Sequence, residues 1–275
     1  MTSKTHYNLW VAGDKRVSLN YDMPDHLAGS KDIEDMRSKD LEAFDYELMQ
    51  VGSSIDKKKD EGVIWRMGFP GMILDVNNVY VKSNGDVELR VRPIHPHRAD
   101  LSFKADNTFY RNVTPLTIAG LMRDKSGVPV LGIRGGDVSN GSVAIIPGGH
   151  VDYEMLPVTN VVDALKREYI EEIGMVWDPA NRMSTLGVMG NDDVPGINIL
   201  NTIDVPYTFD EIKNAWKNAK DRFEHTSILS VPRGKLENLV YNGEMTIDEA
   251  KYTASKKTTT PYFIDCFRHF LEETK

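Results

Sequence analysis

Three glutamates occur on one short segment with helical periodicity, just downstream of a Pro-Gly-Gly turn. They are Glu168, Glu171 and Glu172, and the turn is residues 147–149. Side chains three and four positions apart are neighbours on a helix surface, so all three carboxylates share one face. Such a cluster repels itself unless a cation or basic side chains accompany it. The pattern predicts a buried strand, a tight turn and a helix that presents carboxylates to a divalent cation.

Size and composition limit the class of protein. The chain has 275 residues, 40% of them hydrophobic, which suffices for one large domain or a catalytic domain with a smaller companion. A single cysteine, Cys266, excludes an intramolecular disulfide and is typical of a reducing compartment. The first residues lack the apolar stretch of a secretory signal, and no run reaches the roughly 18 apolar residues of a membrane span. We therefore expect a cytoplasmic protein without a membrane segment.

The net charge of -8 argues against binding to extended nucleic acid. An acidic enzyme that handles phosphates needs a metal ion to mask the repulsion. Oxygen ligands suit Mg²⁺ or Mn²⁺, and magnesium is commonly held by one or two carboxylates together with substrate phosphates. Gly148 and Gly149 allow close approach to the backbone, so a main-chain group can join the site. Arg167 lies four residues before Glu171 and can orient it.

Residues 1–111 are predicted to form an α+β extension. An apolar stripe at helical spacing covers residues 32–50, with Ser30 as a candidate cap, and residues 78–82 and 87–92 surround an Asn-Gly hairpin turn. The charged run at residues 57–62 is typical of a solvated loop or linker. His95 and His97 could suggest a metal pair, but a third ligand is not in view, so a proline-rich turn is the favoured interpretation.

Residues 112–275 are predicted to form an α/β domain that carries the acidic helix. Its elements are indicated by apolar periodicity, β-branched runs and capping residues. The predicted strands span residues 117–122, 128–133, 142–146, 197–205 and 226–231. The predicted helices span residues 159 or 160 to 174, 208 to about 220, and 261–273.

The stretch from Pro147 to Met175 resembles the Nudix box, G-x5-E-x7-R-E-U-x-E-E-x-G-U with U apolar. Residues 167–175 match its second half at every specified position. The first half departs, because 17 residues separate Gly149 from Arg167 where the pattern has 13, so four are extra. The position eight before Arg167 is Thr159 instead of glutamate. Glu154 could replace that glutamate in space, or it is simply a loop residue.

The resemblance covers about residues 114–239 and implies a Nudix-type α/β/α sandwich with a mixed sheet. It implies Mg²⁺- or Mn²⁺-dependent hydrolysis of a nucleoside diphosphate linked to another group, with the three helix glutamates and Gly149 at the metal. The general base of the family often comes from a later loop, which makes Glu224 the first candidate, followed by Asp192 and Asp193. Arg134 can contact a phosphate. Two alternatives stay open: each base candidate can be only an exposed loop acid, and Arg134 can simply pair with a surface carboxylate.

Three function classes are compatible with this sequence. A metal-dependent pyrophosphohydrolase is the main hypothesis, and an acidic helix that is merely a solvated face is disfavoured by the full motif. A Nudix-like nucleotide-binding or regulatory module is the second, because the altered glycine-to-arginine loop could have lost catalysis. An interaction protein that recruits partners through its N-terminal unit is the third. ADP-ribose, nucleotide sugars, dinucleotides and triphosphates are all open as substrates, and analogy alone suggests a homodimer through the N-terminal region.

Overall fold

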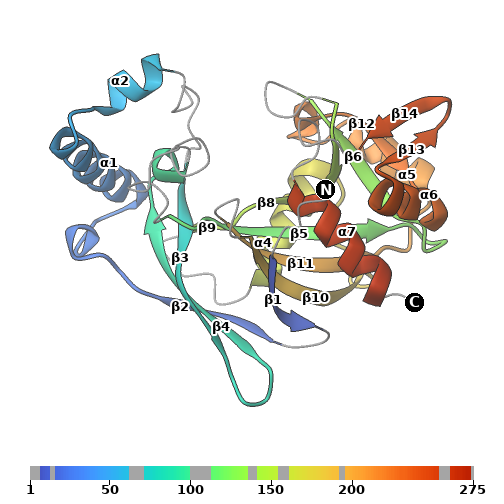
Figure 1. Ribbon diagram of the computed structural model, residues 1–275, viewed down its shortest axis with the longest axis horizontal. Helices are drawn as coiled ribbons and strands as arrows, with labels where there is room; N and C mark the ends of the chain where they lie inside the picture. Colours follow the sequence, from blue (N-terminus) through green and yellow to red (C-terminus); the bar gives the residue numbers. More distant parts are fainter. Residues whose placement is uncertain are drawn as a thin grey trace.

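The computed structural model describes residues 7–12, 16–61, 71–99, 113–135, 141–153, 161–191, 196–253 and 261–273. These residues form a mixed α/β structure, as the sequence predicts. Figure 1 shows an N-terminal sheet with two helices beside a larger part that contains the other sheets and helices. No helix in the described ranges is long and apolar enough to cross a membrane.

The described residues of the N-terminal unit include a four-stranded sheet and the helices α1 and α2. The sheet has the order β2-β4-β3-β9. Its elements are β2 (Val17–Tyr21), α1 (Ile33–Gln50), α2 (Ile55–Asp60), β3 (Met72–Val81), β4 (Val87–Ile94) and β9 (Asp152–Tyr153). Strands β3 and β4 pair antiparallel around the Asn-Gly turn, so both the predicted hairpin and the predicted helix are confirmed.

Two details of this unit differ from the sequence prediction. The cap of α1 is Asp32, whose side chain accepts from the Asp35 N–H, whereas the Ser30 hydroxyl donates to the Leu27 carbonyl at 2.8 Å. Both residues are good caps, and the one nearer the first helical turn is used. The charged run that starts at residue 57 was wrongly predicted as a loop. Ser54 caps a short helix, α2, and most of the charged run forms the end of this helix.

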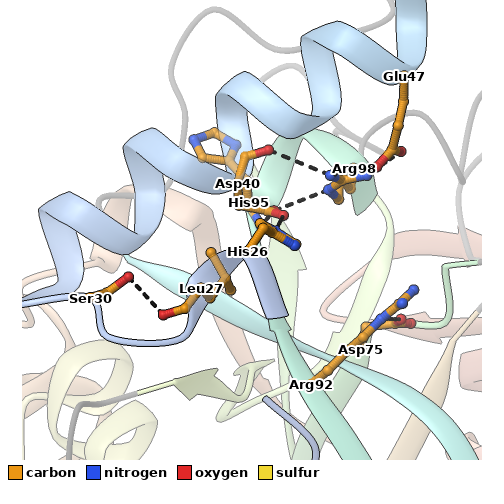
Figure 2. A network of polar contacts seen from close by, with 9 residues as sticks. All are labelled: His26, Leu27, Ser30, Asp40, Glu47, Asp75, Arg92, His95 and Arg98. Atoms are coloured by element: carbon orange, nitrogen blue, oxygen red, sulfur yellow. Dashed lines mark hydrogen bonds and ion pairs between the residues drawn. The ribbon is translucent and has the colours of Figure 1, made fainter. Parts of the chain in front are cut away.

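A buried carboxylate ties α1 to the end of β4 (Figure 2). Oδ2 of Asp40 accepts hydrogen bonds from the His95 N–H at 2.6 Å and from Nε of Arg98 at 3.0 Å. Its Oδ1 lies 2.8 Å from Nε2 of His26, and Arg98 also reaches Glu47 at 2.6 Å. His95 therefore belongs to a polar network that joins three segments of the N-terminal unit.

The larger part contains a mixed five-stranded sheet with the order β1-β10-β11-β5-β8. Strands β5 and β11 are parallel, and the other pairs are antiparallel. A three-stranded sheet, β12-β6-β7, packs beside it, and β13 and β14 form a hairpin. The strands are β1 (Tyr7–Ala12), β5 (Leu116–Arg123), β6 (Val130–Arg134), β7 (Val143–Ile145), β8 (Gly148–His150), β10 (Arg182–Asn191), β11 (Ile197–Asp204), β12 (His225–Ser230), β13 (Glu244–Ile247) and β14 (Ala250–Thr253). The helices are α4 (Val161–Glu168), α5 (Phe209–Trp216), α6 (Arg233–Glu237) and α7 (Pro261–Glu273).

The two units share strands and core. Strand β1 pairs with β10 at the edge of the five-stranded sheet, although it belongs to the first twelve residues of the chain. Strand β9 follows β8 but pairs with β3 of the N-terminal sheet. One apolar cluster contains Met72 and Leu74 from β3 together with Leu165 and Tyr169 from the acidic helix. The apolar core is therefore continuous across the predicted boundary between residues 111 and 112.

The acidic helix ends in a wider turn than predicted, and its two candidate N-caps, Thr159 and Asn160, lie outside the described residues. It is α-helical over α4, and its last turn, Tyr169–Ile173, is π-helical. Leu165, Tyr169 and Ile173 are fully buried, as their spacing predicts. Gly174 ends the helix in the left-handed region, with φ of 76°. A Cβ at this position would lie 2.8 Å from the Ala215 carbonyl, so glycine also lets α5 pack closely.

Candidate functional site

Glu172 is buried against Gly148, which lies in strand β8 and not in the predicted tight turn. Only 2% of the residue is exposed, and its Oε2 accepts the Gly148 N–H at 2.9 Å. Burial raises the pKa of Glu172 well above its usual value, and the nearby Glu224 and Glu168 raise it further. A carboxylate in this position gains by binding a cation, because the surrounding negative groups disfavour its charge.

Glu168 lies directly on the second glycine of strand β8. A Cβ added to Gly149 would come within 2.7 Å of Oε2 of Glu168, closer than packed atoms allow. Glycine is therefore required at position 149, as the sequence indicates. Burial raises the pKa of Glu168 to about 7, although Arg167 opposes the shift. Near neutral pH this carboxyl is poised between its two protonation states.

Glu171 is the most exposed member of the trio. Its Oε1 lies 2.5 Å from Nζ of Lys220, and its Oε2 lies 3.9 Å from Nε of Arg167. Arg167 was predicted to orient Glu171, but the contact between these two side chains is long. Nη2 of Arg167 is closer to Glu168, at 3.4 Å, and to Asp152, at 3.2 Å.

Arg134 and Glu224 form a pair beside the acidic helix. Their Nη1 and Oε2 atoms are 3.3 Å apart, and the Gly135 N–H holds the Glu224 carbonyl at 2.7 Å. Burial raises the pKa of Glu224 above its usual value even though Arg134 opposes the shift. The structure therefore places the predicted base candidate near Glu172 and pairs the predicted phosphate-binding arginine with a carboxylate, one of the alternatives left open by the sequence.

Two residues of this region were missed in the sequence. Asp152, in β9, ion-pairs with Arg167. His225 is buried, and neither ring nitrogen has a hydrogen-bond partner among the described residues. Its ring packs on Gly132, where a Cβ would lie 2.2 Å from Cδ2, and burial lowers its pKa to about 3. Asp152 could have been found in the sequence as an acidic residue of the lengthened Gly149-to-Arg167 segment, whereas no local pattern points to His225.

Several predicted residues cannot be placed. Glu154, Asp192 and Asp193 lie outside the described residues. Among the residues that are described, no three acidic, histidine or cysteine side chains form a ready-made metal cage. Each glutamate of the trio instead has its own partner, which is a backbone amide, an arginine or a lysine.

The donor set nevertheless fits a hard divalent cation. It offers carboxylate oxygens that are partly desolvated, and the pKa values of Glu168 and Glu172 are raised first by burial and then by neighbouring carboxylates. Because Gly149 has no Cβ, the Glu168 carboxyl lies directly against the main chain, so a cation held by Glu168 would lie close to the backbone of this glycine. Magnesium does not need a complete protein cage, since it keeps waters and takes further ligands from phosphates.

No family model and no curated protein matches the chain. Three solved structures that resemble it in part are Nudix or MutT proteins. A MutT protein from Methanosarcina mazei Go1 is 20% identical over 59% of this chain and 96% of its own length, with a TM-score of 0.37. A mutT/nudix family protein from Listeria innocua is 16% identical over 58% and 93%, with a TM-score of 0.38.

The third is the NUDIX domain of Shewanella oneidensis NrtR, complexed with ADP ribose. It is 13% identical over 62% of this chain and 96% of its own length, with a TM-score of 0.37. At these identities and scores, the likeness does not by itself assign an activity to the chain.

Proposed function

We propose that the protein is a metal-dependent pyrophosphohydrolase of the Nudix type. Its substrate would be a nucleoside diphosphate linked to another group. One observation carries the proposal: Glu168 and Glu172 lie against Gly148 and Gly149 of strand β8, and Glu172 is almost completely buried there. A purely solvated acidic face would not desolvate its carboxylates in this way.

The residues that would hold the cation are Glu168, Glu171 and Glu172, together with the Gly149 carbonyl. A bound Mg²⁺ or Mn²⁺ supplies charge neutralisation of the diphosphate and a lower pKa for the attacking water. The protein's own contribution is to fix the carboxylates on a helix that is packed into the core through Tyr169 and Ile173.

Glu224 is the proposed proton acceptor. Its pKa is raised by burial, which moves it toward the range where a carboxylate accepts a proton efficiently. Arg134 keeps it in place through one nitrogen at 3.3 Å. A guanidinium has five N–H donors, so Arg134 can bind phosphate oxygens without releasing Glu224.

The proposal is tested with a nucleotide panel in the presence of Mg²⁺. ADP-ribose, nucleotide sugars, dinucleotides and nucleoside triphosphates are incubated with the full chain, and the products are separated and identified. Cleavage within the phosphoanhydride, lost on chelation of the metal, is the expected result. Binding of a nucleotide without turnover would support the regulatory-module alternative, and neither binding nor turnover would contradict both.

A further inference from the structure

Asp152 lies beside the acidic helix but belongs to the N-terminal sheet. It is in β9, opposite Ile73 of β3. The N–H of the preceding residue, Val151, donates to the Leu116 carbonyl of β5 at 3.0 Å, and its carbonyl accepts the Leu74 N–H of β3 at 3.0 Å. The backbone before Asp152 is therefore bonded to both sheets at once.

Of the three carboxylates for which a contact with Arg167 is described, Asp152 lies nearest to it. Its Oδ2 lies 3.2 Å from Nη2, compared with 3.4 Å for Oε1 of Glu168 and 3.9 Å between Nε and Glu171. Although burial alone lowers it, the pKa of Arg167 is raised above its usual value, first by Asp152 and next by Glu168. Within the described part of the chain, Asp152 is therefore a strong counter-charge of this arginine.

We propose that Asp152 is a positioning residue that holds Arg167 and thereby leaves Glu168 and Glu171 available to a divalent cation. This rests on the proposed function, because it assumes that the two glutamates bind metal. Without Asp152, the guanidinium charge would be satisfied by the carboxylates already 3.4 and 3.9 Å away. An arginine and a cation would then compete for the same oxygens.

The carboxylate that reaches the arginine comes from the lengthened segment of the chain. The Nudix pattern expects a glutamate eight positions before Arg167, where this chain has Thr159. Strand β9 lies within the same Gly149-to-Arg167 segment, which is longer than the pattern. Asp152 supplies a carboxylate from this segment, at a position fixed by strand pairing.

Hydrogen bonds from β3 fix the N-terminal sheet to the chain before β5, next to the strand that carries Asp152. The buried Asp75 of β3 accepts the Thr114 N–H at 2.5 Å and Nε of Arg92 at 2.8 Å, and the Arg92 contact is seen in Figure 2. The Val76 N–H also donates to the Thr114 carbonyl at 2.8 Å. Strand β3 thus holds both the start of β5 and the strand that carries Asp152, which makes the N-terminal unit part of the site.

The test measures metal binding, not only turnover. Mn²⁺ is titrated calorimetrically into the full chain, into Asp152→Asn and into the control Asp163→Asn. Asp163 lies on the acidic helix, and its side chain is 62% exposed. Loss of a group that orients ligands typically costs about 10- to 100-fold in metal affinity, which is expected for Asp152→Asn and not for the control. Asp152→Glu keeps the charge and should fall between the two, which also serves if Asp152→Asn does not fold.

A double-mutant cycle separates positioning from direct binding. Since Asp152 acts through Arg167, adding Asp152→Asn to Arg167→Gln should change Mn²⁺ affinity by less than about twofold. Additive losses of Mn²⁺ affinity in the double mutant would overturn the inference. Wild-type Mn²⁺ affinity in Asp152→Asn would also overturn it. If Asp152→Asn does not fold, wild-type Mn²⁺ affinity in Asp152→Glu would overturn it instead. A wild-type chain that binds no Mn²⁺ overturns the proposed function as well, whereas one that binds Mn²⁺ while Asp152→Asn is unaffected overturns this inference alone.

Discussion

The Gly148 amide and the Glu172 carboxyl are joined by a 2.9 Å hydrogen bond that links strand β8 to the last turn of the acidic helix. Glu172 is almost fully buried, and other carboxylates surround it. A buried acid normally needs a cation or several donors to remain charged. This contact therefore marks the place where a metal ion would stabilise the site most.

Glu172→Gln should retain the fold and lose metal-dependent turnover. Glutamine keeps the volume and can still accept the Gly148 N–H through its amide oxygen, but it removes the ligand charge. Turnover is expected to fall by roughly 100-fold or more, while the thermal unfolding midpoint in the absence of metal stays near that of the wild type. Initial rates with Mg²⁺ and a thermal melt measure the two effects. Unchanged hydrolysis would reject the assignment of Glu172.

Gly149→Ala should displace Glu168. The added Cβ would lie 2.7 Å from Oε2 and 2.8 Å from Cδ of Glu168, so the carboxyl must move. A displacement of about 1 Å in a reacting group can cost roughly 100-fold in rate. Steady-state kinetics should therefore show a large decrease in kcat. Gly234→Ala is a matched control, because nothing lies within 4 Å of its added Cβ and activity should stay at the wild-type level.

Asp40→Asn should destabilise the N-terminal unit without touching the glutamates. Although burial alone raises it, the pKa of Asp40 is held below its usual value by Arg98, with which it pairs at 3.0 Å (Figure 2). Breaking a buried pair from one side costs about 3–5 kcal/mol. Urea unfolding should show a loss of this size. Glu34→Gln, whose side chain is 83% exposed, should change stability by less than about 0.5 kcal/mol and serves as control.

The sequence predicts those parts of the site that depend on local periodicity. Glu168, Glu171 and Glu172 are placed by helix geometry, and the buried Leu165 and Ile173 follow from the same period. The prediction of a tight turn at the two glycines was wrong, because Gly148–His150 forms a strand that pairs with β5. Glycine disfavours strands, so this pairing reflects tertiary contacts that outweigh local preference.

Long-range pairing accounts for what the sequence did not predict. The ion pair between Asp152 and Arg167 depends on β9 joining β3, which is more than seventy positions earlier in the chain. The buried ring of His225 depends on Gly132 of the neighbouring strand. Contacts between distant segments leave no periodic pattern in either segment, and a two-residue strand such as Asp152–Tyr153 is too short to show one.

His95 should make folding stability depend on pH in a defined window. Burial lowers the pKa of His95 to about 3, and the charges of His97 and Arg37 lower it further. In the unfolded chain a histidine titrates near about 6.5, so between that pH and about 3 only the unfolded state takes up the proton. The stability from neutral His95 is therefore complete above about pH 6.5 and is lost as the pH falls toward 3. The slope is up to about 1.4 kcal/mol per pH unit.

His95→Asn removes this titration and keeps a side-chain acceptor for the His97 N–H, which contacts Nδ1 of His95 at 3.2 Å. The pH dependence of the unfolding free energy between pH 6 and 4 should become shallower by about 1.4 kcal/mol per pH unit than in the wild type. Because burial also lowers the pKa of His225 to about 3, His225→Asn should flatten the same window independently. A His95 ring that titrates near pH 6.5 in the NMR spectrum of the folded protein would contradict this prediction, since a ring that protonates equally in both states adds no pH dependence to folding.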